Sequence, residues 1–150
     1  MWLIRFIAGM LENSIMLSCL VSWFLAQICK AIVSSVKQKR IDLSNLFRTG
    51  GMPSSHAAVV ASLSAAIYLS EGISSLFVFS LVFLIIVIHD AYTLRMTIGK
   101  QTSIIKDLSR QMKLKQMKDF RGVLGHTMFQ IVMGMLLGAI VSITIYYLRM

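Results

Sequence analysis

Apolar residues gather in four stretches, at about 15–36, 55–70, 73–92 and 127–148, with charged segments between them. A helix needs about 20 residues to cross the hydrocarbon core of a bilayer, with roughly 17 as the lower limit. The first, third and fourth stretches meet this length, whereas the second is short and predicts a tilted or partly re-entrant helix. We therefore predict an all-α integral membrane helical bundle with about four transmembrane helices. Residues 1–11 are a candidate extension of the first span.

The composition supports a membrane protein. Hydrophobic residues make up 57% of the chain and charged residues 14%, against roughly 25% charged residues in soluble domains. The net charge is +9, with 15 Lys and Arg against 6 Asp and Glu. In so apolar a chain, this excess is typical of loops that face an anionic lipid surface. We expect an anionic lipid surface as a partner and no nucleic acid.

The basic residues also predict an orientation. Thirteen of the 15 lie between the first and second spans or between the third and fourth, and the Glu71-Gly72 turn has none. They are Lys30, Lys37, Lys39, Arg40, Arg48, Arg95, Lys100, Lys106, Arg110, Lys113, Lys115, Lys118 and Arg121. The positive-inside rule therefore places both segments in the cytoplasm and both termini outside.

The segment 95–122 is interpreted as a cytoplasmic loop. Its apolar residues, which are Leu108, Met112, Met117 and Phe120, could form the edge of a basic surface helix. That helix would attract anionic lipid or substrate headgroups. Alternatively, the segment is a solvated cytoplasmic loop, and the positive-inside rule alone accounts for most of its charges.

The most informative pattern is Gly50-Gly51-Met52-Pro53-Ser54-Ser55-His56, at the start of the second span. The two glycines allow the backbone to approach a ligand, and Pro53 stands where it can open a helix. Free N–H groups at a helix N-terminus bind phosphate, while Ser54 and Ser55 are good N-cap residues. His56 could exchange a proton with a phosphate ester, or could simply cap the span.

The predicted topology brings three polar clusters to one membrane face. His56 begins the second span, Asp90 and Arg95 end the third, and His126 begins the fourth. Ionisable residues at membrane depth are functional candidates. Two histidines across a phosphate provide a nucleophile and a general acid. Gln130, one turn after His126, could steer the ring of that histidine.

Several of these residues have alternative roles. Arg95 and Arg48 are suited to holding phosphate oxygens, and Asp90 could hold an arginine or orient a histidine. His126 could instead be a polar group that reaches the interface, and His89 is interpreted as structural. Cys19 and Cys29, which would lie about 15 Å apart on one helix, are too distant for a disulfide.

Three segments together resemble a known family. They are Gly50-Gly51-Met52-Pro53-Ser54-Ser55-His56-Ala57-Ala58, then Asp90-Ala91 with Arg95 and Gly99, then Gly125-His126-Thr127. In order and spacing they resemble the divergent branch of the type-2 phosphatidic acid phosphatase superfamily, often described as related to acid phosphatases and vanadium-dependent haloperoxidases. The resemblance covers nearly the whole chain. It implies one membrane-embedded, phosphatase-like domain over residues 1–150.

The resemblance implies that the protein cleaves phosphate from a lipid through a phosphohistidine. His56 would protonate the leaving oxygen and His126 would attack phosphorus. Ser55 and the neighbouring backbone N–H groups, at Gly51 and Ser54, would hold phosphate oxygens. No metal ion or other cofactor is implied.

The sequence departs from the superfamily pattern in three places. Gln130 stands where an aspartate usually follows the nucleophilic histidine, so either Asp90 supplies the negative charge or catalysis is weak. Arg121 only loosely matches the arginine that precedes that histidine. Arg40 and Arg48 are the nearest matches to an upstream lysine–arginine–proline motif.

These features lead to a hypothesis and an alternative. The hypothesis is a phosphatase that acts on a membrane lipid substrate, such as phosphatidylglycerophosphate or phosphatidic acid, in a bacterial-type cytoplasmic membrane with the active site facing the cytoplasm. The alternative, motivated by Gln130, is a non-catalytic protein that binds anionic lipid or a protein partner. A homodimer would complete the packing of the short second span. Gly134 and Gly138 indicate close helix packing, within or between protomers.

Overall fold

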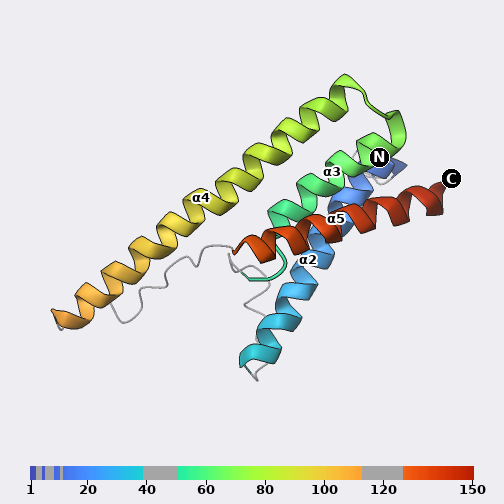
Figure 1. Ribbon diagram of the computed structural model, residues 1–150. Helices are drawn as coiled ribbons and strands as arrows, with labels where there is room; N and C mark the ends of the chain where they lie inside the picture. The colour runs from blue at the N-terminus through green and yellow to red at the C-terminus, as the bar shows by residue number, and fades with distance from the viewer. Residues whose placement is uncertain (3–4, 6–8, 11, 39–50, 113–126) are drawn as a thin grey trace.

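The computed structural model describes residues 1–2, 5, 9–10, 12–38, 51–112 and 127–150, except the side chains of 37–38 and 94–96. Its elements are the helices α2 (Ser14–Gln38), α3 (Ser55–Glu71), α4 (Ser75–Gln111) and α5 (Met128–Arg149), shown in Figure 1. The predicted all-α bundle is therefore confirmed.

Polar caps set the starts of these helices. The Asn13 Oδ1 atom accepts hydrogen bonds from the backbone N–H groups of Ile15 and Met16, each at 3.0 Å. Asn13 itself is not helical, so α2 begins after it, and the helix of the first span does not continue unbroken through residue 13. At α3 the N-cap is Ser54. Pro53 therefore precedes the cap, whereas the sequence suggested that it opens the helix.

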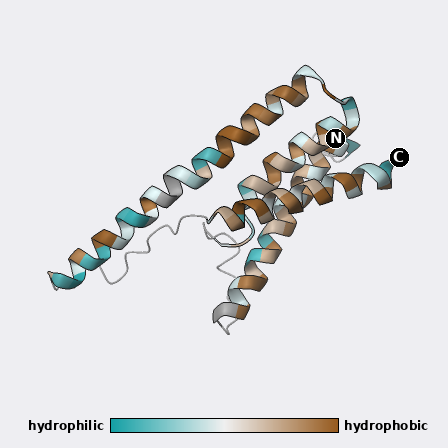
Figure 2. Cartoon of the chain, viewed as in Figure 1, coloured by the Kyte–Doolittle hydropathy of each residue, from teal (hydrophilic) through white to brown (hydrophobic). Residues whose placement is uncertain are grey.

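The largest difference from the sequence prediction concerns α4. The predicted third span ended near 92, and residues 95–122 were interpreted as a loop or a separate basic surface helix, but α4 continues as one helix of 37 residues to Gln111. At 1.5 Å per residue it is about 55 Å long, well beyond the roughly 30 Å hydrocarbon core. Figure 2 shows that its second half is largely hydrophilic. Charged residues do not by themselves end a helix, and no proline interrupts α4 after its apolar half.

The helices are arranged as the predicted topology requires. Both termini and the α3–α4 turn lie toward one end of the bundle, which we call the terminus end (Figure 1). The starts of α3 and α5 and the end of α2 lie toward the other, which we call the site end. Of the described helices, α2, α4 and α5 are long and apolar enough to cross a membrane. Which side each end faces stays a prediction.

The short helix α3 is the centre of the bundle, and it contacts α2, α4 and α5. Its closest neighbour is α5, where Gly134 and Gly138 lie against the α3 backbone. A Cβ atom at Gly134 would collide with the Ser54 carbonyl oxygen, and one at Gly138 would collide with that of Ala58. The glycine pair therefore serves packing within the protomer.

Candidate functional site

The start of α3 is joined to the first turn of α5. The Ser54 side chain is fully buried, and its Oγ atom accepts a hydrogen bond from the Ala57 N–H at 3.4 Å. The Ser54 N–H donates to the carbonyl oxygen of Gln130 at 2.9 Å. Ser54 thus caps α3, as the sequence suggested, and fixes the N-terminus of α3 against α5.

The side chain of Lys30, in α2, extends to the N-terminus of α3. Its side chain is buried, with 7% exposed, and its Nζ atom donates to Ser55 Oγ at 2.8 Å and to Gln27 Oε1 at 3.3 Å. Burying an ammonium group is costly unless hydrogen bonds or an opposite charge compensate it. These two hydrogen bonds hold the ammonium group at the N-terminus of α3.

The position of Lys30 differs from the sequence prediction. It was counted among the basic residues of a cytoplasmic loop, yet it lies within α2. The signal was available, because Lys30 is a charged residue inside the apolar stretch 15–36, and such residues are functional candidates. Its partner across the helix interface could not be read from the sequence.

Gly51 lies beside Lys30 in a backbone conformation that favours glycine. Its φ angle is 111°, a value that L side chains rarely adopt. A Cβ atom at Gly51 would lie 3.7 Å from Lys30 Cγ. The backbone at Gly51 therefore passes along the aliphatic part of the Lys30 side chain.

Three of the candidate segments contact one another in a small buried cluster. Ala57 of α3, Ala91 of α4 and Ile131 of α5 pack together, with 1%, 4% and 0% of their surfaces exposed. Each directly follows a predicted site residue: His56, Asp90 and Gln130 respectively. The structure therefore brings these segments to one level of the bundle, with His56 and Asp90 exposed.

Gln130 is part of a helix cap. Its Oε1 atom accepts a hydrogen bond from the Thr127 N–H at 3.0 Å, and its own N–H donates to Thr127 Oγ1 at 3.4 Å. These reciprocal bonds form a capping box, which satisfies N–H groups at the start of α5. The cap of α5 is Thr127 and the helix begins at Met128. His126 lies outside the described residues, so its predicted relationship to Gln130 stays a prediction.

Other predicted residues cannot be placed as side chains. His126, Arg48 and Arg121, together with Arg40, lie outside the described residues. Arg95 lies in α4, but its side chain is not described. His89 makes a local contact on α4, where its Nε2 atom lies 3.5 Å from Thr93 Oγ1. Within the described part of the chain, no three His, Cys, Asp or Glu side chains are grouped to hold a metal ion.

The site end of the bundle thus contains the N-terminus of α3, the buried ammonium group of Lys30 and the exposed residue His56. A helix N-terminus and an ammonium group both favour negative charge. The sequence matches the divergent PAP2 family over residues 11–141, and the chain belongs to that family. It is also similar to the uncharacterized membrane protein YuiD of Bacillus subtilis (strain 168), with 31% identity over 156 residues, 94% of this chain and 99% of that protein. No solved structure matches the chain.

Proposed function

We propose that the protein is an integral membrane phosphatase that hydrolyses a lipid phosphate monoester at the site end of the bundle. The observation that carries this proposal is the buried hydrogen bond from Lys30 to Ser55 at the N-terminus of α3. It places a cation at a helix N-terminus, where phosphate oxygens are favoured, although the Ser54 N–H that was predicted to hold phosphate donates to the Gln130 carbonyl oxygen instead. Membership of the divergent PAP2 family supports the same class of chemistry.

In this proposal the phosphate oxygens lie against the α3 N-terminus, Ser55 and Lys30. His126 attacks phosphorus, the bond from phosphorus to the lipid oxygen breaks, and His56 donates the proton that the leaving oxygen needs. Water then hydrolyses the phosphohistidine and releases inorganic phosphate. Asp90 supplies negative charge near the histidines, while Arg95, Arg48 and Arg121 hold the phosphate. The exposure of His56 leaves its ring accessible to a headgroup.

The test is phosphate release by the purified full chain in detergent. The substrates are phosphatidylglycerophosphate, phosphatidic acid and a prenyl phosphate. We expect turnover of one of them, abolished by His126→Ala and by His56→Ala. His89→Ala is the matched control and should keep wild-type turnover, because His89 contacts Thr93 on its own helix. Unchanged turnover in His126→Ala would contradict the mechanism.

Lys30→Gln tests the phosphate-holding role directly. The variant keeps a hydrogen-bond donor for Ser55 but removes the charge. A hydrogen bond to a charged group is worth about 1.5–3 kcal/mol, which predicts a fall in kcat/KM of at least about tenfold. Lys106→Gln, at an exposed position of α4, is the control for loss of one positive charge. Equal activity of the two variants would exclude Lys30 from the site.

A second candidate function is binding without catalysis. The observation that favours it is the capping box of Gln130, because this residue stands where the superfamily usually has an aspartate. A capping glutamine cannot stabilise an imidazolium charge as a carboxylate does. This alternative predicts headgroup binding that depends on charges such as Lys100 and Lys106 but no phosphate release. Steady turnover by purified protein would rule it out.

A further inference from the structure

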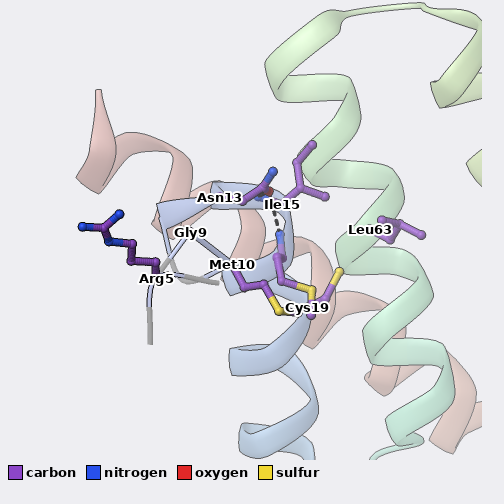
Figure 3. A pocket seen from close by; sticks show the side chains of 8 residues that line it. Arg5, Gly9, Met10, Asn13, Ile15, Cys19 and Leu63 are labelled. Carbon is purple, nitrogen blue, oxygen red and sulfur yellow. Dashed lines mark hydrogen bonds between the residues drawn. The ribbon is translucent and has the colours of Figure 1, made fainter. Parts of the chain in front are cut away.

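A cavity of about 530 Å³ lies at the terminus end of the bundle, away from the Lys30–Ser55 site. Four residues that precede α2, the first turns of α2 and one residue of α3 line it, as Figure 3 shows. Its volume is within the roughly 300–1,000 Å³ of small-molecule sites. Nothing in the proposed phosphatase chemistry uses it.

The lining has an apolar part and a cationic edge. Met10, Met16, Cys19 and Leu63 supply sulfur and hydrocarbon surfaces. Arg5 also lines the cavity, and in Figure 3 its guanidinium group is turned away from Cys19, toward the periphery. A ligand that fits this arrangement has a hydrocarbon chain and an anionic group at one end.

The position of the cavity in the bundle agrees with such a ligand. The candidate membrane span of α2 begins at Ser14, so the cavity adjoins the level where headgroups meet acyl chains. Arg5 and Arg149 are the two basic residues outside the thirteen considered above. The Arg149 guanidinium donates to the carbonyl oxygen of Glu12 at 2.6 Å, so both basic residues lie near the start of α2. That helix N-terminus adds a further partial positive charge.

We propose that this cavity holds one acyl chain of an anionic phospholipid, taken from the leaflet at the terminus end, with the lipid phosphate beside Arg5. Met10, Met16 and Leu63 contact the chain, and the unbranched thioether side chains adapt to its shape. This site is separate from the proposed phosphatase site, so either proposal can fail without the other.

Cys19 provides a reporter inside the cavity, and Cys29 provides its matched control. Both thiols are free and partly exposed on α2, but only Cys19 lines the cavity. Cys29→Ser leaves Cys19 as the one thiol, and Cys19→Ser leaves Cys29. Each variant is placed in nanodiscs of phosphatidylcholine, with or without phosphatidylglycerol, and N-ethylmaleimide labelling is timed.

We expect phosphatidylglycerol to slow labelling of Cys19 by about fivefold, the factor that corresponds to about 1 kcal/mol for one basic residue near an anionic headgroup. Cys29 should label at the same rate in both discs. Arg5→Gln, at an exposed position, should remove the protection of Cys19. Leu63→Trp should fill the cavity and abolish retention of phosphatidylglycerol in native mass spectrometry. Equal labelling of Cys19 in both discs, or equal slowing of both thiols, would overturn the proposal.

Discussion

The contact between α3 and α5 differs from the long helix α4 in the size and burial of its side chains. Small residues form the α3–α5 contact, where the backbone of one helix lies against glycines of the other. Large apolar side chains cover the first half of α4, and most remain exposed, as at Phe79, Ile85 and Ile86. Only 11% of the apolar window of α4 is buried, against 28% for α5.

This difference follows from the solvent. Lipid tails are as apolar as leucine, so apolar surface alone gives two membrane helices little reason to associate. Close packing and hydrogen bonds between helices supply the attraction, and glycine and serine permit both. The candidate site lies at the tight contact, because the hydrogen bond from Ser54 to Gln130 joins the starts of α3 and α5 there. By contrast, α4 joins that region through the small residue Ala91.

The largest expected effect is on membrane insertion, and it should differ between lysine substitutions in the two halves of α4. Ile85 and Ile104 are both exposed, at 65% and 59%, but Ile85 lies in the apolar half and Ile104 in the hydrophilic half. A lysine near the centre of a transmembrane helix costs about 2.5–3.5 kcal/mol of insertion free energy. Ile85→Lys should therefore reduce membrane insertion strongly, and Ile104→Lys should not.

Insertion efficiency in a cell-free translation with microsomes measures both variants of α4. Ile104→Lys is the control for the addition of a lysine to the same helix. Equal losses at the two positions would mean that the bilayer covers α4 well beyond its apolar half. In that case the helix would have to lie strongly tilted.

The sequence predicted the parts of this structure that depend on local chemistry. The second span was expected at 55–70 and α3 is Ser55–Glu71, because a serine cap and a glycine turn bound it. The continuous helix of α4 to Gln111 was not predicted, because the charged residues after 92 were taken to end the helix together with its apolar span. Lys30 was misplaced for a different reason: its role depends on Ser55, which is 25 residues away and approaches only when α2 packs on α3.

The glycine contact itself should be sensitive to a single methyl group. Gly138→Ala places a Cβ atom against the Ala58 carbonyl oxygen and 2.9 Å from the Ser62 backbone nitrogen. Backbone atoms of a helix cannot move aside as a side chain can, so α3 and α5 must separate. Overpacking of this kind costs about 1–3 kcal/mol. The free energy of unfolding in mixed micelles should fall by that amount.

Gly9→Ala is the control for the glycine substitution. A Cβ atom at Gly9 would meet nothing within 4 Å, so the same chemical change should leave stability unaltered or slightly improved. A similar loss in both variants would show that the loss in Gly138→Ala does not arise from the contact between α3 and α5. The close approach of α3 and α5 would then contribute little to stability.

The smallest effect concerns the hydroxyl pair at the same contact. Ser62 Oγ and Ser142 Oγ lie 2.7 Å apart, and Ser142 Oγ also donates to the Ser62 carbonyl oxygen at 2.8 Å. Hydrogen bonds between membrane helices contribute about 0.6 kcal/mol on average. A double-mutant cycle of Ser62→Ala and Ser142→Ala should give a coupling free energy of that size.

Thr144 bonds within its own helix, to Ile140, so a cycle that pairs Ser62→Ala with Thr144→Ala should give none. Coupling in the first cycle alone would show that the hydroxyls hold the helices together, whereas no coupling in either would leave the glycines as the sole cause of the close approach.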